Sequence, residues 1–329
     1  MVRTYAAFRR VVKGFGLGLG LVLAAPSPSQ GQGLPAFAPL NPVATSRSGL
    51  YFQPYREPAP GRWISSVQMD YASVIEYNQL PPVSYVLDSE IMAVSFGASR
   101  DIGARTFVAL SASAEGAYSG FLDGFLDWYH GVLGIRISER EKRPEDQFLY
   151  SMHLSDGRTV ARSSSNLFLG DMRVGLGLRL NHSLQTVLSL TLPTSTGPQG
   201  YGRGVPSVGT LTTLRAPLRP HLVYEGSLGL GFTPTHGDLS NLQRTTFLAL
   251  SSGLRYRFWG RQALFGNLFY HTPYYRGTSL PALDQRELSL DFGWILDTSD
   301  GGEWRVGLTE DLEPAGPGVD LMLRLGRTF

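Results

Sequence analysis

The chain of 329 residues contains no cysteine, and only 17% of its residues are charged. Without cysteine, neither a disulfide-stabilised scaffold nor an N-terminal lipid carried on a cysteine thiol can form. Beyond the N-terminus, no apolar run approaches the roughly 20 residues that a membrane-spanning helix needs. The six histidines show no paired ligand spacing, so we predict no metal site and no cofactor. Stability must therefore come from burial or from the closure of a sheet.

Acidic and basic residues are interspersed and nearly balanced, with a formal net charge of +2. This pattern lacks the basic stripe of a nucleic-acid-binding protein, so we expect no nucleic-acid partner.

Residues 1–31 have the pattern of a secretory signal peptide. Basic residues without any acid precede an apolar stretch from Phe15 to Ala25, which is too short to cross a bilayer as a helix. Small residues follow, with plausible cleavage contexts at 22–24 and 29–31. The alternative, an uncleaved N-terminal anchor, requires a longer apolar run. We therefore expect an exported protein whose signal peptide is cleaved.

Two regions follow the predicted signal. Residues 32–62 are Pro-rich and without periodicity, which predicts an irregular periplasmic or lumenal lead-in. From Trp63 onward, apolar residues alternate with polar residues and glycine, and this period of two predicts strands. The predicted strands are 63–73, 84–98, 104–115, 167–180, 184–192, 206–216, 220–232, 244–257, 261–272, 285–297, 302–311 and 318–329.

The connections between these segments alternate in length. Short links such as 181–183 and 258–260 alternate with longer ones at 74–83, 116–166 and 233–243. Short turns at one end and long loops at the other are typical of outer-membrane barrels, whose strands are also long. We therefore predict an all-β fold: a transmembrane, antiparallel, up-and-down barrel of about 12 strands formed by residues 63–329, with 116–166 as a long extracellular loop.

Aromatic residues gather near the predicted strand ends, which suits a girdle at the lipid interfaces. The last strand ends on Phe329, which resembles the C-terminal signal read by the barrel-assembly machinery. We therefore expect that machinery and outer-membrane lipid as partners of a monomer in the bacterial outer membrane. The girdle candidates are Trp63, Phe232, Tyr256, Phe258, Trp259, Tyr270, Tyr274, Tyr275, Trp304 and Phe329.

Charged residues of both signs occur on the predicted inward face of the strands. Opposite charges in a narrow lumen pair with each other, so two roles stay open: a salt-bridged core, or the lining of a narrow channel or binding site. The candidates are Asp70, Glu115, Asp171, Arg173, Arg179, Glu225, Arg255, Arg257, Glu287, Asp291, Arg305, Asp320 and Arg324.

The long loop carries an amphipathic segment at 120–135, with apolar residues at helical spacing. This short helix could serve as a lid, an interfacial anchor or a plug, or as a packing element that caps the barrel mouth. The residues singled out for it are Phe121, Phe125, Asp127, Trp128 and His130.

The same loop continues into a polar hairpin predicted around Asp156-Gly157. His153 and Ser155 lie at positions i and i+2 and are followed by Asn166, an arrangement similar to the H-x-S pair of outer-membrane lipid hydrolases. In that alternative, His153 activates Ser155 and Asn166 orients the histidine. An ordinary exposed hairpin explains the same residues.

Several short motifs resemble an uncharacterised family of Gram-negative outer-membrane barrel proteins, defined by a domain of unknown function. The resemblance implies location and architecture, and it adds no reaction. The motifs are YREPAPGRW (55–63), GFLDGFLDWYHGVLGI (120–135), LGDMRVGLGLRL (169–180), LTLPTSTG (190–197) and GLTEDL (307–312).

These patterns lead to three functional hypotheses. The first is a channel, transporter or binding protein for a small molecule or lipid, lined by the inward charges and gated by the 120–135 helix. The second is a lipid hydrolase that uses His153 and Ser155. The third is a structural or surface-interaction barrel whose lumen is closed.

Overall fold

The computed structural model describes residues 33–48, 50–134, 144–313 and 316–329. The signal peptide predicted at 1–31 lies outside the described residues and stays a prediction. Within the described ranges, no helix combines the length and the apolar character that crossing a membrane requires.

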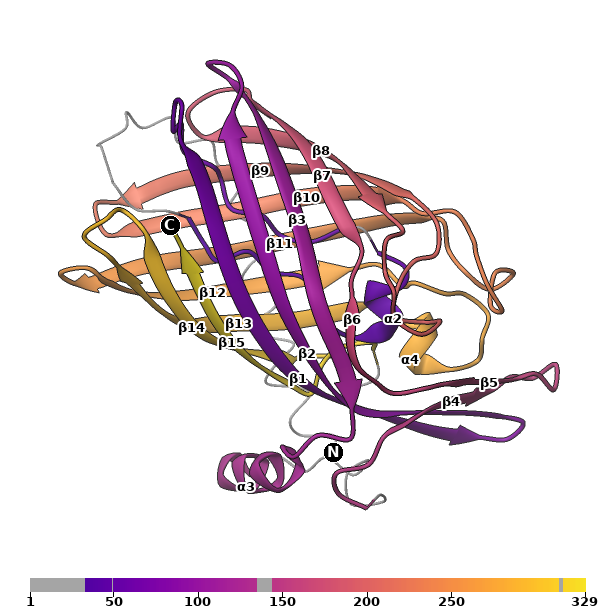
Figure 1. The fold of residues 1–329 in the computed structure, drawn as a ribbon. Helices are drawn as coiled ribbons and strands as arrows, with labels where there is room; N and C mark the ends of the chain where they lie inside the picture. Colours follow the sequence, from indigo (N-terminus) through magenta and orange to yellow (C-terminus); the bar gives the residue numbers. More distant parts are fainter. Residues whose placement is uncertain (1–32, 49, 135–143, 314–315) are drawn as a thin grey trace. The chain divides into compact units, whose positions relative to one another are not determined.

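Twelve of the described strands form a closed antiparallel barrel, in which each strand pairs with the next and β15 pairs back with β1 (Figure 1). The prediction of a twelve-stranded transmembrane barrel is thereby confirmed. The barrel strands are β1 (Trp63–Leu80), β2 (Val83–Asp101), β3 (Thr106–Tyr118), β7 (Met172–Arg179), β8 (Leu184–Leu192), β9 (Ser207–Arg219), β10 (Leu222–Phe232), β11 (Thr246–Trp259), β12 (Gln262–His271), β13 (Glu287–Asp297), β14 (Glu303–Asp311) and β15 (Leu321–Thr328).

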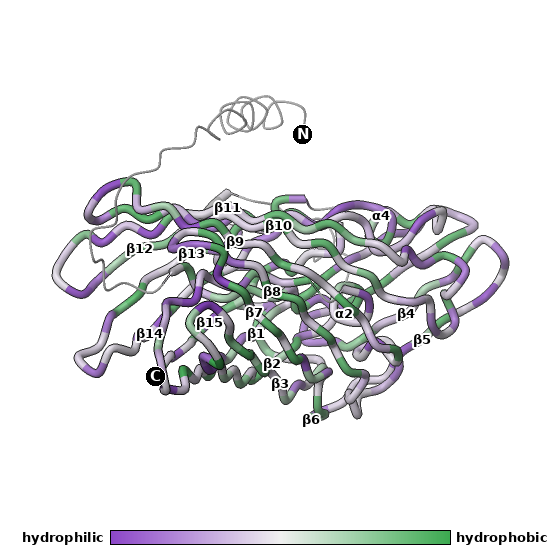
Figure 2. Tube along the Cα trace, turned by 90° about the horizontal axis from the view of Figure 1, so that it is seen from above, coloured by the Kyte–Doolittle hydropathy of each residue, from purple (hydrophilic) through white to green (hydrophobic). Residues whose placement is uncertain are grey.

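The alternation predicted from the sequence sets which side chains face outward. In β7, Val174, Leu176 and Leu178 are exposed on the outer wall, whereas Gly175 and Arg179 between and beyond them are buried. Figure 2 shows the same alternation of apolar and polar residues along the strands. An apolar outer wall around a polar interior is the reverse of a soluble barrel and suits a lipid environment.

The region between β1 and β2 differs from the prediction. The long loop expected at 74–83 is instead a continuation of both strands, which stay paired from Trp63↔Arg100 to Leu80↔Val83. The extension beyond the neighbouring strands is stabilised by a further strand, because β4 (Leu149–His153) pairs with residues 84–88 of β2. The sequence did not predict this extension of β1 and β2, because residues 74–80 include polar residues that do not fit the pattern of a membrane strand.

Two more short strands lie outside the closed barrel. β5 (Thr159–Arg162) pairs with β4, which confirms the hairpin predicted around Asp156-Gly157. β6 (Ser165–Leu169) pairs with the end of β3, so the strand predicted at 167–180 is divided at Gly170 into β6 and β7.

Residues 33–48 and 50–60 form a hairpin inside the barrel, which we call the inner hairpin. It rises to the short helix α2 (Pro42–Thr45) and returns toward the start of β1, and an antiparallel bridge joins Phe37 and Phe52 of its two arms. Asn41 caps α2 by accepting from the backbone N–H of Val43 at 2.8 Å. The lead-in predicted at 32–62 is therefore lumenal over its described part.

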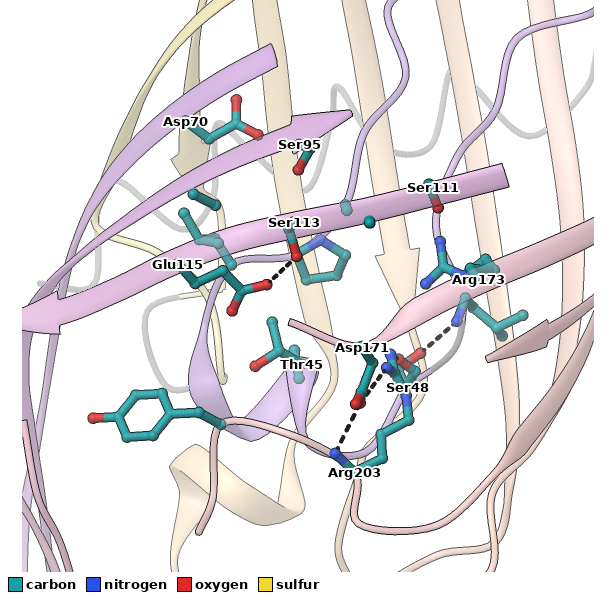
Figure 3. A pocket seen from close by; sticks show the side chains of 18 residues that line it. Thr45, Ser48, Asp70, Ser95, Ser111, Ser113, Glu115, Asp171, Arg173 and Arg203 are labelled. Carbon is teal, nitrogen blue, oxygen red and sulfur yellow. Dashed lines mark hydrogen bonds and ion pairs between the residues drawn. The ribbon is translucent and has the colours of Figure 1, made fainter. Parts of the chain in front are cut away.

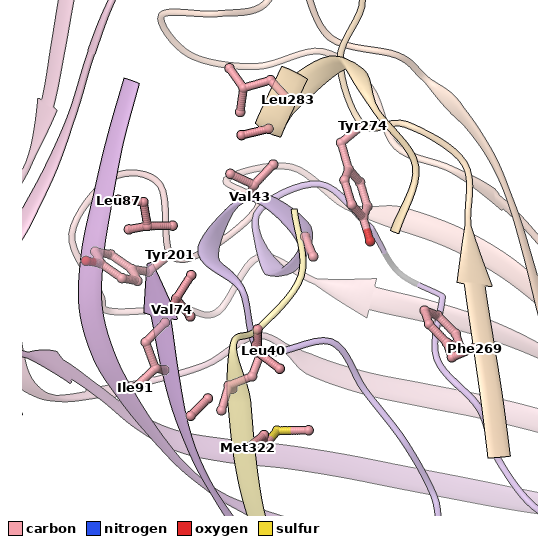
Figure 4. Packing of buried hydrophobic residues seen from close by; sticks show 14 of the residues in the cluster. Leu40, Val43, Val74, Leu87, Ile91, Tyr201, Phe269, Tyr274, Leu283 and Met322 are labelled. Atoms are coloured by element: carbon pink, nitrogen blue, oxygen red, sulfur yellow. The ribbon is translucent and has the colours of Figure 1, made fainter. Parts of the chain in front are cut away.

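Apolar side chains of the inner hairpin complete a core with inward-facing residues of the barrel (Figure 4). Phe37 lies 4.8 Å from Phe269 between ring centroids, and Leu40 and Val43 belong to the same cluster as Met322. Burial of a side chain of this size contributes about 1.5–3 kcal/mol. Tyr274 and Tyr275 also belong to this core, so their prediction as girdle residues is wrong.

Two further helices lie at the end of the barrel that carries the long loops, which we call the long-loop end, as opposed to the short-turn end (Figure 1). α4 (Pro281–Asp284) lies between β12 and β13, and its Leu283 is fully buried. α3 (Asp123–Leu133) confirms the helix predicted at 120–135; it begins three residues later and ends at its C-cap Gly134, and residue 135 lies outside the described ranges.

Candidate functional site

Most of the lumen is occupied by contacts between the inner hairpin and buried charges of the wall. Arg324 on β15 donates from Nη1 to Asp291 at 2.5 Å, from Nε to Asp70 at 3.2 Å and from Nη2 to the carbonyl of Ala36 at 2.6 Å. All three charged groups are almost fully buried. One guanidinium thus joins β1, β13, β15 and the inner hairpin.

A second buried network lies toward the short-turn end. Arg255 on β11 donates to Asp297 at 2.5 Å, to Glu303 at 2.9 Å and to the carbonyl of Gly33 at 3.1 Å. Glu225 on β10 accepts from the backbone N–H of Leu34 at 3.1 Å. These hydrogen bonds join the wall either to Gly33 and Leu34 of the inner hairpin or to other charged residues of the wall.

At the short-turn end, the returning arm is bound to the first strands. Asp101 pairs with Arg179 at 2.5 Å and also with Arg56 of the inner hairpin. Both guanidinium carbons lie over the ring of Phe107, at 5.0 and 5.1 Å from its centroid. This cluster narrows the lumen where β2, β3 and β7 begin or end.

At the long-loop end, the turn of the inner hairpin is bound by polar contacts. Asn41 donates from Nδ2 to Glu76 and to the carbonyl of Gly318, both at 2.7 Å. Ser48 Oγ lies 2.7 Å from Nε2 of His271. The inner hairpin is therefore attached at both ends of the barrel.

The wall formed by β2 and β3 is different, and we call it the open side. From Ser95 to Ser99 and from Ala109 to Ser113, its inward-facing residues are small and only half-buried, whereas inward-facing Ser289 of β13 and Thr309 of β14 are 1% and 0% exposed. The open side consists of Ser95, Gly97, Ser99, Ala109, Ser111 and Ser113.

A cavity of about 120 Å³ separates the open side from the inner hairpin near the long-loop end (Figure 3). Ser95, Ser111 and Ser113 contribute hydroxyls to it, and Leu40 and Ala44 of the inner hairpin lie opposite. A polar space of this size holds several water molecules.

Five charged residues line the cavity: Asp70, Glu115, Asp171, Arg173 and Arg203. Arg203, in the loop between β8 and β9, donates to Asp171 at 3.1 Å and also to the carbonyl of Ser48. Burial lowers the pKa of Arg203 to about 10. Arg173 lies over the ring of Tyr51 at 3.5 Å, and Glu115 accepts from Ser113 Oγ at 2.5 Å.

The predicted lumen residues occur on the inward face with one exception. Asp320 precedes β15, so the strand parity does not apply to it, and its carboxylate lies 3.7 Å from Nε2 of His130 on α3. Glu287 accepts from Tyr274 at 2.6 Å, and Arg257 and Arg305 pair with Asp297 and Glu303 beside Arg255.

The structure corrects the predicted position of the 120–135 helix, which lies on the outer wall and not across the lumen. Leu122 and Leu126 pack with the outward-facing Leu321 of β15. The carboxylate of Glu90 accepts from the first backbone N–H groups of the segment, including that of Phe121 at 2.9 Å. The residues exposed on the far face of the helix and at its start are Phe121, Phe125, Asp127, Trp128 and Val132.

The residues of the hydrolase hypothesis are not assembled into a site. His153 Nδ1 bonds with Thr159 Oγ1 at 2.9 Å, across the exposed β4–β5 hairpin. Ser155 lies in the turn of that hairpin, and Asn166 lies on β6, which pairs with β3. A nucleophile and its base must lie within hydrogen-bond reach, so this geometry does not favour hydrolysis.

Several residues that attach the inner hairpin to the rest of the protein were not identified from the sequence. Arg47 donates to the carbonyls of Thr233 at 3.2 Å and Arg244 at 2.8 Å, and it is 1% exposed. Arg56 and Arg203 were missed as well. A signal was available, because charged residues in an apolar, Pro-rich lead-in need buried partners if the segment is lumenal.

The chain is similar in fold to outer-membrane barrels of known structure. The outer membrane channel of the COG4313 group from Pseudomonas putida F1 is 13% identical, with a TM-score of 0.54 over 83% of this chain and 97% of that chain. The NanC porin is 7% identical, with a TM-score of 0.46 over 80% of this chain and 98% of that chain. No curated protein matches the sequence.

At this identity the first likeness concerns the fold alone, which is that of outer-membrane β-barrels. The family resemblance predicted from the short motifs is confirmed by a match over almost the whole described chain. The protein belongs to the family described as "Protein of unknown function (DUF3187)", which matches residues 30–329.

Proposed function

We propose that this protein is a narrow outer-membrane channel for a small polar solute, with the open side as its route. The observation that carries the proposal is the contrast in exposure across one lumen: small half-buried residues on β2 and β3, and fully buried ones on β13 and β14. Because Ser, Gly and Ala project little, they leave room beside the inner hairpin. The serine hydroxyls replace part of the hydration of a passing solute.

The inner hairpin acts as a fixed constriction in this proposal. Its ion pairs and apolar contacts are buried, so moving it as a whole would leave several charges unpaired. A solute therefore passes beside it, from the cavity to the cluster of Asp101, Arg56 and Arg179 at the short-turn end. Selection by size and charge occurs at these two places.

The outer-membrane channel of similar fold is consistent with this role at the level of the fold only. The third hypothesis, a barrel with a closed lumen, is the competing outcome, since the inner hairpin fills so much of the interior. Outer-membrane location, export through residues 1–31 and assembly through Phe329 belong to the proposal. Phe329 is 54% exposed beside Arg327 and suits recognition by an assembly factor.

Cysteine accessibility tests the route, because the native chain has no cysteine. Ser95→Cys and Ser111→Cys introduce thiols on the open side, and Ser289→Cys places the matched thiol at a fully buried position on β13. The refolded variants are inserted into planar bilayers and treated with a charged methanethiosulfonate reagent. We expect rapid modification and loss of current for the first two variants and no change for the third. Equal inertness of all three, with no current from the native protein, would overturn the proposal.

A further inference from the structure

Two charged side chains at the cavity differ from the other charged residues there, since Asp70 pairs with Arg324 and Asp171 pairs with Arg203. Arg324, Arg255 and Arg179 each pair with at least one buried carboxylate. In contrast, no ion pair of Glu115 or of Arg173 occurs within the described residues. A carboxylate and a guanidinium thus face the same water-accessible space without neutralising each other directly.

Their local contacts leave bonding capacity toward the cavity. Glu115 accepts from the neighbouring Ser113 hydroxyl, and a carboxylate can accept several further bonds. The hydrogen bond of Arg173 among the described residues runs from Nε to Thr191 Oγ1 at 3.3 Å, so its two terminal nitrogens are left for another acceptor. Stacking on Tyr51 keeps the guanidinium plane in place.

The two charges lie on opposite sides of the cavity, with the hydroxyls of Ser111 and Ser113 between them (Figure 3). Ser111 is the register partner of Arg173, and Glu115 lies four residues further along β3. At about 3.3 Å per residue, the two Cα positions are on the order of 13 Å apart, and the long side chains shorten the gap between the charges.

Gly170 provides the space that Glu115 occupies. A Cβ atom at this position would collide with Ser113 Oγ and with Glu115 Oε1. Any other residue would therefore displace the carboxylate of Glu115 without removing its charge. The glycine at the break between β6 and β7 thus allows the Glu115 carboxylate to occupy its position at the cavity.

From this arrangement we propose that the cavity binds a small zwitterion, with its cationic group at Glu115 and its anionic group at Arg173. The inference rests on the proposed function, because it names the solute class of the same route. A zwitterion of suitable length forms charge-assisted bonds at both ends at once. A solute of single charge leaves one of the two groups unmatched, and a neutral solute leaves both. The serine hydroxyls between the ends hydrate the middle of the solute.

The test uses four probes of one chain length: 4-aminobutyrate, butyrate, butylammonium and butyramide. Flux of each into liposomes that contain the refolded full chain is measured. The native protein is expected to take up 4-aminobutyrate faster than butyramide by roughly tenfold, the effect of a hydrogen bond to a charged group. Glu115→Gln and Arg173→Gln should each bring this flux ratio close to one. Their residual preferences should be opposite, for butyrate and for butylammonium respectively.

Two control variants distinguish a loss of solute recognition from a defect in folding. Asp127→Asn removes the same charge from the exposed face of α3 and should leave the flux ratio of the native protein unchanged. Gly170→Ala keeps every charge but displaces the carboxylate, so it should lower the ratio in the same direction as Glu115→Gln. Each variant is first checked for the native barrel by its heat-modifiable migration on a denaturing gel.

The outcomes separate this inference from the channel itself. If butyramide enters but the native flux ratio is one, or if the ratio survives in both glutamine variants, zwitterion binding is overturned and the channel stands. If no probe enters, yet 4-aminobutyrate raises the thermal stability of the native protein and not of Glu115→Gln, the zwitterion site stands and the channel is overturned.

Discussion

The part of the lumen lined by β11–β15, which we call the filled side, differs from the open side in how its side chains contact the inner hairpin. Both sides are built from the same kind of antiparallel strand. On β11–β15, long charged residues such as Arg255 and Arg324 reach the inner hairpin and bond to its carbonyls. On β2 and β3, the serines at 95 and 111 face the cavity that separates them from the inner hairpin, and Ser99 reaches it only through the long side chain of Arg56. The comparison teaches that the openness of a barrel of this size depends less on strand number than on the length of the inward side chains.

The largest effect is expected for Arg324→Ala on the filled side. The substitution leaves Asp70 and Asp291 buried with no counter-charge, and such a loss costs about 3–5 kcal/mol. Urea unfolding in detergent, followed by tryptophan fluorescence, measures it. Arg173→Ala is the matched change at the open side and should cost less than about 1 kcal/mol, because Arg173 is half-exposed and has no ion pair among the described residues. Similar costs for both would refute the distinction between the two sides.

Next in size is the effect of a bulky residue placed on either side. Ser289→Trp forces a large ring into a fully buried site, where overpacking costs about 1–3 kcal/mol or more. Ser111→Trp projects into the cavity, so we expect near-native stability and a strongly reduced single-channel conductance. Paired unfolding and conductance measurements decide this prediction. An unaltered current in folded Ser111→Trp would show that the route lies elsewhere.

A moderate effect is expected for Asn41→Ala, which loosens the turn of the inner hairpin. The variant loses the cap of α2 and the bonds to Glu76 and Gly318, at a cost of about 1–2 kcal/mol. Urea unfolding measures the loss of stability. An increase in the noise of the single-channel current indicates that the inner hairpin has become less rigid. Asn181→Ala, in an exposed short turn, serves as the control. It should leave the noise of the single-channel current at the level of the native protein.

The smallest effect concerns the loops at the long-loop end. The hydrogen bond from Arg162 lowers the pKa of Asp238. Its contribution to stability is therefore present above the ordinary carboxyl range and is lost as the pH falls through the lowered pKa. Because the Asp238 side chain is solvent-exposed, the loss should stay below about 1 kcal/mol. Melting curves of the native protein and of Asp238→Asn between pH 7 and 3 should differ only slightly, and a large difference would contradict the assignment.

Local patterns predicted the strands well, because alternation is a property of neighbouring residues. Met172, Val174 and Leu176 indicated the outer face of β7 before any pairing was known. The extension of β1 and β2 was missed, since its stability depends on β4, which lies more than 60 residues away along the chain. The position of α3 was missed for a similar reason: its apolar stripe does not reveal whether it packs on the lumen or on the outer wall.

The sequence by itself determined the strand periodicity, the up-and-down order with its short and long connections, and the inward placement of nearly all the charges that we singled out. The tertiary structure decided how those charges are used. The sequence of the inner hairpin shows no periodicity, and its position is set by contacts with strands as far as 288 residues away, such as that of Ala36 with Arg324. Which charges are paired by that segment, and which are left facing water, follows from its path through the lumen.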